Sequence, residues 1–286
     1  MVDAEVCRAW GITPGNLLSA RATRTWAAER NGEPYIVQRF PFAIDYQLKV
    51  AAALRERGWP TPQPAREPLT GENGVWALFH RLPGEPAHTL DHRARGRLLA
   101  ELHSDALATG ITDQREGWTG PAQRVADPEL ESWLRRYEKC SPQAGTLLLR
   151  CRDAALEWFT AHPSPEAPSG VIHGDFTPWN LLYSGGQLTG VLDFEGTHHT
   201  FQVADFALSW RGHQDDVLRG YDEVRPLTDA EWNLILPVYW SWLLLGLTAL
   251  PVEKADLRWQ VDHLHRHSPL LAGKTGRGGL FNHGRR

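Results

Sequence analysis

The chain has 286 residues, a formal net charge of −4 and three cysteines. This length allows one large domain or two small domains with a substantial core. The slightly acidic balance argues against a protein that binds nucleic acid, and three widely spaced cysteines indicate neither a disulfide framework nor a zinc site.

Strand and turn signals dominate the N-terminal region. The opening residues, MVDAEVCRAWG, carry charges where a signal peptide needs an apolar core, so we expect a cytoplasmic protein. A helical pattern further on ends at Gly58 and the prolines that follow it. The predicted elements are strands at residues 17–20, 23–28, 35–40 and 75–80 and a helix at 46–57.

A polar break containing proline and glycine, residues 81–85, precedes a mostly helical region. The most apolar stretch, 234–250, has about the length of a membrane span, but proline, serine and glycine interrupt it. We therefore expect a buried helix and no membrane contact. The Gly/Arg-rich tail, 273–286, is predicted to be disordered. The predicted helices are 89–105, one or two within 129–161, 230–252 and 261–267.

Residues 171–193 read VIHGDFTPWNLLYSGGQLTGVLD and predict a hairpin that turns at Gly185-Gly186. A two-residue turn would place Asn180 opposite Val191. Asn180 and Asp193 would then meet at the open end of the ribbon, roughly 7 Å apart on strand spacings.

Asp175 precedes this hairpin in a loop that Pro178 keeps from becoming a helix. We expect the oxygen-bearing side chains of Asp175, Asn180 and Asp193 to converge where a hard cation is held. Two carboxylates and an amide are the minimum set for phosphoryl transfer from a nucleotide–magnesium complex.

These motifs resemble the aminoglycoside phosphotransferase and choline kinase superfamily, whose members are related to protein kinases. The matching residues are His173-Gly174-Asp175 with Asn180, then Asp193-Phe194-Glu195, then Asp205-Phe206-Ala207. The resemblance implies an α+β, two-lobed protein-kinase-like fold, in which a small antiparallel β-sheet lobe joins a larger, mainly helical lobe. It implies a nucleotide-binding lobe over residues 1–82 that ends in a hinge, and a catalytic and acceptor-binding lobe over 83–272.

The resemblance also implies the co-substrate, the metal and the roles of individual residues. ATP (or GTP) would donate the phosphate, with Mg²⁺ bound. Asp175 would accept the proton of the acceptor hydroxyl or orient it, and Asn180 and Asp193 would hold the Mg²⁺. Three residues would have supporting roles: His173 would fix the loop, Asp205 would brace it through backbone amides, and Glu195 would support the metal site.

One part of the chain departs from the kinase pattern. The strand at 35–40 lacks the expected lysine and offers Gln38 and Arg39, and the following helix offers Gln47 and Lys49 in place of the expected glutamate. Strand alternation puts Gln38 and Arg39 on opposite faces, so only one can point into the cleft. Arg39 could replace the lysine, whereas an inward Gln38 predicts low nucleotide affinity. The predicted nucleotide-binding residues are Gln38, Arg39, Arg81 and Leu82.

The function predicted from these features is phosphorylation of a small-molecule hydroxyl, most simply on an aminoglycoside-like antibiotic, an amino sugar or an amino alcohol. An antibiotic acceptor would imply a role in resistance. A cationic acceptor could be attracted by acidic residues that could equally form a solvated loop, namely Asp215, Asp216, Asp222 and Glu223. The alternatives are a pseudokinase-like binding module and a kinase of peptide Ser/Thr hydroxyls in a natural-product pathway. The predicted partners are a nucleotide and a small-molecule acceptor, with neither nucleic acid nor membrane, and the sequence carries no signal for an oligomeric state.

Overall fold

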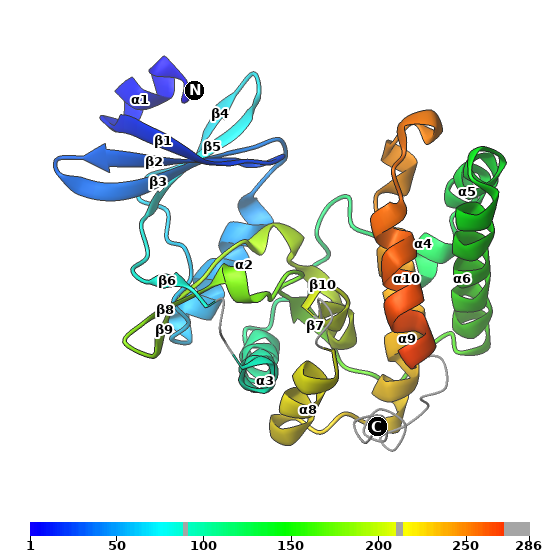
Figure 1. Ribbon diagram of the computed structural model, residues 1–286. Helices are drawn as coiled ribbons and strands as arrows, with labels where there is room; N and C mark the ends of the chain where they lie inside the picture. Colours follow the sequence, from blue (N-terminus) through cyan, green and yellow to red (C-terminus); the bar gives the residue numbers. More distant parts are fainter. Residues whose placement is uncertain (88–90, 210–213, 272–286) are drawn as a thin grey trace. The chain divides into compact units, whose positions relative to one another are not determined.

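The computed structural model describes residues 1–87, 91–209 and 214–271 (Figure 1). The chain divides into two compact units. One comprises Met1–Thr89 and Pro178–Thr197, and the other comprises Leu90–Thr177 and His198–Arg286. The chain therefore leaves the first unit, returns to it for one hairpin and leaves it again. The predicted α+β class is confirmed, because an antiparallel sheet forms in the first unit and most helices belong to the second.

The first unit contains a five-stranded antiparallel sheet in the order β1-β2-β3-β5-β4. The four strands predicted here are present. The short strand β4 and the helix α1 were not predicted from the sequence. The elements are α1 (Ala4–Trp10), β1 (Thr13–Ala20), β2 (Arg24–Arg30), β3 (Glu33–Phe40), α2 (Asp45–Glu56), β4 (Leu69–Gly71) and β5 (Gly74–His80).

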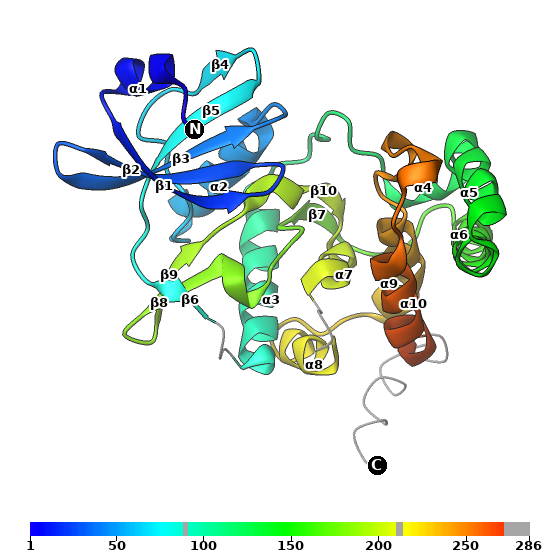
Figure 2. The same ribbon diagram turned by 45° about the horizontal axis from the view of Figure 1, so that its top comes forward.

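The two helices of this unit cover opposite faces of the sheet (Figures 1 and 2). On one face, Trp10 of α1 packs into a buried cluster with Val37 of β3. On the other face, Phe40 of β3 is buried in a second cluster, against which Leu48 of α2 packs. Successive residues of β3 therefore point alternately toward α1 and toward α2, as the pleat of a strand requires.

A separate hairpin completes the first unit. It consists of β8 (Leu181–Ser184) and β9 (Gln187–Val191), and the two-residue strand β6 (Glu85–Pro86) pairs with β8. Both turn glycines have positive φ, 58° at Gly185 and 82° at Gly186, as the predicted two-residue turn requires.

The predicted register of this hairpin is wrong by one residue at its open end. Ser184 faces Gln187 as expected, but Val191 faces Leu181 and not Asn180. A β-bulge causes the shift, because the ladder steps over Thr189 on β9. The Thr189 hydroxyl donates a hydrogen bond to the carbonyl of Pro83 at 2.6 Å, which gives the extra residue a partner outside the ladder.

The second unit is mainly helical and contains one two-stranded antiparallel ladder. The helix predicted at 230–252 ends earlier, and its last part forms short 3-10 turns after Gly246, which has a φ of 75°. Helix α8 was not predicted, and the tail at 273–286 lies outside the described residues. The elements are α3 (His92–Ala108), α4 (Pro121–Ala126), α5 (Pro128–Cys140), α6 (Pro142–Ala161), β7 (Ser169–Ile172), β10 (His198–Phe201), α7 (Phe206–Ser209), α8 (Gln214–Val224), α9 (Asp229–Leu243) and α10 (Arg258–Leu271).

The segment Asp229–Ala249 is long and apolar enough to cross a membrane, by length and composition alone. Within the protein, 56% of its most apolar window is buried. Helix α9 packs against α4, α6 and α10. A core helix passes the same test of length and composition, so this segment is weak evidence for a membrane span.

Helices α3 and α8 lie side by side in both views (Figures 1 and 2) and pack very closely. Two glycines allow this approach. A Cβ atom added at Gly96 of α3 would overlap the carbonyl oxygen of Val217, and one added at Gly220 of α8 would overlap the carbonyl oxygen of Arg93. Any larger residue at either position would force the two helices apart.

Candidate active site

The loop that carries Asp175 follows strand β7 in the second unit, and three of its backbone amides are engaged in succession. The amides of His173 and Gly174 donate to the carboxylate of Asp205, at 2.8 and 2.9 Å. The amide of Asp175 donates to the Nδ1 atom of His173 at 3.2 Å. Gly174 has a φ of 86°, which favours glycine at this bend. Three consecutive amides are thus fixed immediately before the Asp175 side chain.

Arg95 of helix α3 holds the other end of the loop. Its guanidinium is fully buried and donates to the carbonyl of Phe176 at 2.8 Å. Arg95 was not predicted from the sequence. A signal was present, since Arg95 shares the buried face of α3 with Leu99 and Leu102 at helical spacing. A charged residue inside such an apolar stripe indicates a specific buried partner.

Asp205 is fully buried and also accepts a hydrogen bond from the Nε2 atom of His103 at 3.0 Å. Burial alone would raise the pKa of the Asp205 carboxyl. The hydrogen bond from His103, together with the backbone amide of His173, outweighs the burial, so this pKa lies below its ordinary value. The carboxylate therefore stays ionised and remains an acceptor on both of its oxygens.

Asn180 and Asp193 both belong to the first unit, at the open end of its hairpin. The carbonyl of buried Asn180 accepts a hydrogen bond from the amide of Leu192 at 2.8 Å, so Asn180 lies across the hairpin from the residue before Asp193. Asp193 adopts a left-handed conformation, with φ 65° and ψ 65°, which is uncommon for a residue other than glycine. The hairpin end thus fixes the backbone of both residues.

These two side chains fit a Mg²⁺ site. One supplies an amide oxygen and the other a carboxylate oxygen, both hard ligands. Among the described residues, no group of three or more His, Cys, Asp or Glu side chains gathers to form a metal site by itself.

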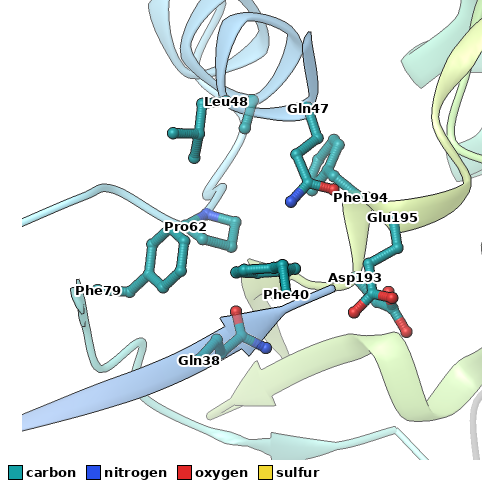
Figure 3. A pocket seen from close by; sticks show the side chains of 10 residues that line it. Gln38, Phe40, Gln47, Leu48, Pro62, Phe79, Asp193, Phe194 and Glu195 are labelled. Carbon is teal, nitrogen blue, oxygen red and sulfur yellow. The ribbon is translucent and has the colours of Figure 1, made fainter. Parts of the chain in front are cut away.

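A small pocket of about 40 Å³ lies within the first unit, between β3, α2 and the hairpin end (Figure 3). Gln38 points into it and donates a hydrogen bond from its Nε2 atom to the Thr25 hydroxyl at 3.2 Å. Gln47 of α2 is buried, and its Oε1 atom has no hydrogen-bond partner in the described structure. The lining residues are Gln38, Phe40, Gln47, Leu48, Ala51, Pro62, Phe79, Asp193, Phe194 and Glu195.

Arg39 lies on the opposite face of β3. Its guanidinium carbon is 5.8 Å from the ring centroid of Trp76, within the range of a cation–π contact. Of the two candidates for the lysine position, Gln38 lines the pocket and Arg39 does not. Gln38 and Gln47 therefore place two neutral amides where the kinase pattern places an ion pair.

The two predicted hinge residues, Arg81 and Leu82, lie between β5 and β6. Arg81 is exposed and Leu82 is half-buried, and neither lines this pocket. The roles assigned to Arg81 and Leu82 remain predictions. Glu195 does line the pocket, together with Asp193.

The acidic residues considered as an acceptor attractor or a solvated loop form part of helix α8. Glu223 accepts hydrogen bonds from Arg93 and Arg97, which lower the pKa of its carboxyl. Asp222 is buried and accepts a hydrogen bond from the amide of Leu227 at 2.9 Å. Both carboxylates are thus engaged within the protein and belong to a helix, which corrects the interpretation as a solvated loop. Attraction of a cationic acceptor stays a prediction, and Asp216 of the same helix is exposed. The side chain of Asp215 lies outside the described structure.

Comparison with known proteins places the chain among phosphotransferases. The profile of the phosphotransferase enzyme family matches residues 16–231, more than half of the chain. Homoserine kinase of Brucella melitensis biotype 1 is 28% identical over 260 residues, which covers 80% of this chain and 78% of that protein. Homoserine kinase of Rhizobium johnstonii is 28% identical over 226 residues, and the alignment covers 68% of this chain and 64% of that protein.

Solved structures with the same fold include an aminoglycoside phosphotransferase and an amicoumacin kinase. A thermostable mutant of aminoglycoside phosphotransferase APH(4)-Ia, in its apo form, has a TM-score of 0.69 at 16% identity and covers 96% of this chain and 100% of its own. Amicoumacin kinase hAmiN, solved with AMP-PNP, Ca²⁺ and Ami, has a TM-score of 0.65 at 15% identity and covers 96% and 94%. At these identities the likeness concerns the fold.

Proposed function

Because the chain belongs to the phosphotransferase enzyme family, we propose that it transfers the γ-phosphate of ATP or GTP to a hydroxyl group of a small molecule. The observation that carries this proposal is the fixed loop at 173–176. Three of its amides and one carbonyl are held by buried groups, so the position of the Asp175 backbone is closely determined. A general base requires such fixed placement.

Asp175 is the residue we assign to the acceptor hydroxyl. As the hydroxyl oxygen attacks the γ-phosphorus, the Asp175 carboxylate orients it and takes its proton. Asn180 and Asp193 would hold Mg²⁺ through oxygen ligands. Bound there, the Mg²⁺ would neutralise charge on the phosphate oxygens.

For the acceptor we propose an amino alcohol of the homoserine type. Support comes from the two homoserine kinases, which align with 80% and 68% of this chain at 28% identity. Further support comes from helix α8, where Asp222 and Glu223 are engaged by Leu227, Arg93 and Arg97 and so are less available to attract a polycationic aminoglycoside. An aminoglycoside-like antibiotic or an amino sugar is the second candidate, favoured by the solved aminoglycoside phosphotransferase and amicoumacin kinase that share the fold.

The test is a nucleotide-consumption screen with mass-spectrometric detection of the phosphorylated product. The panel contains homoserine, other amino alcohols, amino sugars, aminoglycosides and Ser/Thr peptides, each with ATP and with GTP. We expect Asp175→Asn to lower kcat by about a thousandfold or more while Mg²⁺–nucleotide binding stays near the wild-type value. Asp229→Asn, at an exposed aspartate that begins α9, serves as the control and should keep full activity.

Three results would count against the proposal. Turnover of Asp175→Asn at the wild-type rate would remove Asp175 from its role. Nucleotide binding without turnover of any acceptor would favour the pseudokinase-like module, and phosphorylation of only the peptides would favour a peptide kinase.

A further inference from the structure

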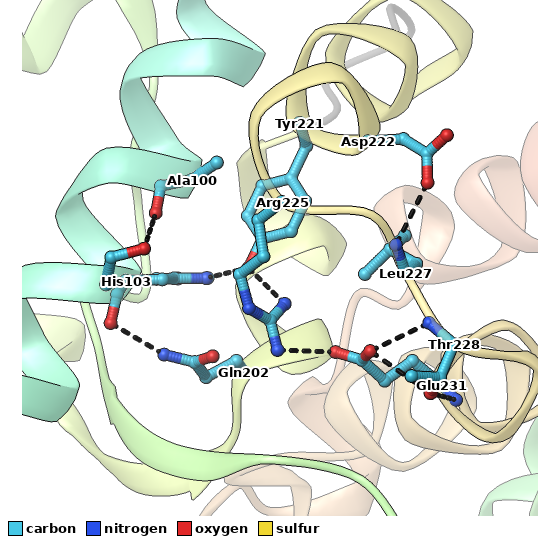
Figure 4. Close-up of polar contacts among 10 residues, drawn as sticks. Ala100, His103, Gln202, Tyr221, Asp222, Arg225, Leu227, Thr228 and Glu231 are labelled. Carbon is cyan, nitrogen blue, oxygen red and sulfur yellow. Dashed lines mark hydrogen bonds and ion pairs between the residues drawn. The ribbon is translucent and has the colours of Figure 1, made fainter.

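A line of hydrogen bonds continues from Asp205 through the second unit, and Figure 4 shows its part from His103 to Glu231. The ring of His103, which contacts Asp205 through Nε2, contacts the Tyr221 hydroxyl through Nδ1 at 2.8 Å. Arg225 donates to the same hydroxyl at 2.7 Å and to the Glu231 carboxylate at 2.8 Å. The line therefore joins α3, α8 and α9 to the loop of Asp175.

Every member of this line except Arg225 is almost completely shielded from water. His103, Asp205 and Tyr221 have no exposed surface, Glu231 is 1% exposed, and the Arg225 side chain is 17% exposed. Buried polar groups without matched partners are costly, so each group here needs a compatible donor or acceptor. This requirement makes it possible to assign the hydrogen atoms.

Only one assignment of the hydrogen atoms gives every hydrogen bond in this line one donor and one acceptor. Arg225 can only donate, so the Tyr221 oxygen accepts from it. The Tyr221 O–H then donates to Nδ1 of His103, which must be unprotonated, and the proton of the neutral ring lies on Nε2 and is donated to Asp205. If Nδ1 carried a proton instead, the Tyr221 oxygen would receive two donors and its own hydrogen would have no acceptor among the hydrogen bonds that the described structure provides.

The far end of the line is fixed as well. Glu231 lies three residues after Thr228 and forms a capping box at the start of α9, where its Oε2 accepts from the Thr228 amide at 2.9 Å. Its Oε1 accepts from Arg225. Tyr221 itself follows Gly220, whose missing side chain lets α8 approach α3. The phenol therefore reaches His103 from a helix that packs directly against α3.

We propose that Tyr221 is a positioning residue for the loop of Asp175. Its hydroxyl fixes the proton of His103 on Nε2, and this orients the carboxylate of Asp205 that holds the amides of His173 and Gly174. The proposal rests on the proposed function, because it assigns Tyr221 an effect on the chemical step through Asp175. Its structural part can be tested without any substrate.

The test compares Tyr221→Phe with Tyr239→Phe in the full chain. Tyr239 is an equally buried tyrosine of the second unit, and its hydroxyl lies 3.5 Å from Nδ1 of His263, outside this line. We expect Tyr221→Phe to lower kcat about tenfold, with the KM for nucleotide within about twofold of wild type, and to speed native-state amide exchange at Gly174 about tenfold. Tyr239→Phe should leave both quantities near the wild-type values.

A second measurement needs neither turnover nor a variant. The ¹⁵N chemical shifts of the His103 ring in the wild-type protein report which nitrogen carries the proton, and we expect Nε2–H. A ring protonated on Nδ1, or Gly174 exchange in Tyr221→Phe equal to that in Tyr239→Phe, would overturn the proposal. If no acceptor is ever phosphorylated but the shifts and exchange rates come out as expected, the proposed function fails and the link from Tyr221 to the loop stands.

Discussion

The loop of Asp175 and the pocket lined by Gln38 and Gln47 both bury polar groups, but they do so in opposite ways. The loop is held by ionised side chains, Asp205 and Arg95, whose buried atoms bind specific backbone groups. The pocket contains the neutral amides of Gln38 and Gln47, and the Oε1 atom of Gln47 has no hydrogen-bond partner in the described structure. A buried charge that is hydrogen-bonded to specific backbone groups fixes them and is costly to remove, whereas a buried amide oxygen without a partner adds nothing that its removal would lose.

The strongest expected effect of this difference is on the stability of the loop. Asp205→Ala would leave two buried amides and the ring of His103 without their acceptor, and we expect a loss of about 3–5 kcal/mol in the free energy of unfolding. Urea denaturation at pH 7 measures it. A loss below about 1 kcal/mol would show that the carboxylate does not fix the loop.

The charge on Asp205 also predicts a dependence on pH. Its folded-state pKa lies below the ordinary value of 3.8, so its contribution to stability is complete above pH 3.8 and is lost as the pH falls toward the folded-state pKa. Urea midpoints of wild type and Asp205→Asn, compared between pH 7 and pH 3, test this. We expect the gap between the two proteins to narrow at the acidic end, and a gap that widens there would contradict the assignment.

We expect the pocket to tolerate the lysine and glutamate of the kinase pattern in place of Gln38 and Gln47. In the double variant Gln38→Lys/Gln47→Glu, an ammonium and a carboxylate would face the same small space, and we expect Mg²⁺–ATP to bind about tenfold more tightly than to wild type. Calorimetric titration measures the Kd. The control is Gln38→Arg, which adds a positive charge at position 38 without the carboxylate at position 47. Unchanged affinity in the double variant would mean that this pocket does not face the phosphates.

The smallest effect is expected from removing the unpartnered amide. Gln47→Leu should leave the free energy of unfolding unchanged or raise it by about 1 kcal/mol, because the buried oxygen gains nothing from folding. Gln202→Leu is the matched variant in the second unit. The Oε1 atom of the equally buried Gln202 also has no hydrogen-bond partner in the described structure, but its Nε2 atom donates to the carbonyl of His103 at 2.9 Å. That variant should lose about 1–2 kcal/mol. Equal losses in both would remove the contrast between the two regions.

Local signals predicted the elements of the fold well. Apolar periodicity and turn residues located β3, β5, α2 and the hairpin turn at Gly185-Gly186. The hairpin register failed because the bulge at Thr189 depends on the carbonyl of Pro83, more than a hundred residues away in the chain. Helix α8 was missed because its acidic residues resembled a solvated loop, while their partners Arg93 and Arg97 lie on α3.

The residues of the candidate site likewise divide into those that local sequence signals predicted and those that depend on distant parts of the chain. The motif residues His173, Asp175 and Asp205 were recognised from adjacent letters of the sequence. The groups that fix the loop, Arg95 and His103, were not, since they lie on α3 at least 70 residues before that loop. Strand alternation established that only one of Gln38 and Arg39 could face the cleft side of β3. The packing of Trp10 and Trp76 on the face that carries Arg39 shows that Gln38 is the residue on the pocket side.

The close approach of α3 and α8 has a consequence for sequence variation. Gly96 and Gly220 are assigned no chemical role, yet even an alanine at either position would press on a backbone carbonyl of the other helix. In a library that randomises each position under selection for activity, these two sites should be as depleted of substitutions as Asp175 itself. Their intolerance would come from the helix spacing that keeps Tyr221 within reach of His103. In such a library, a steric requirement at two glycines would therefore look the same as a catalytic requirement.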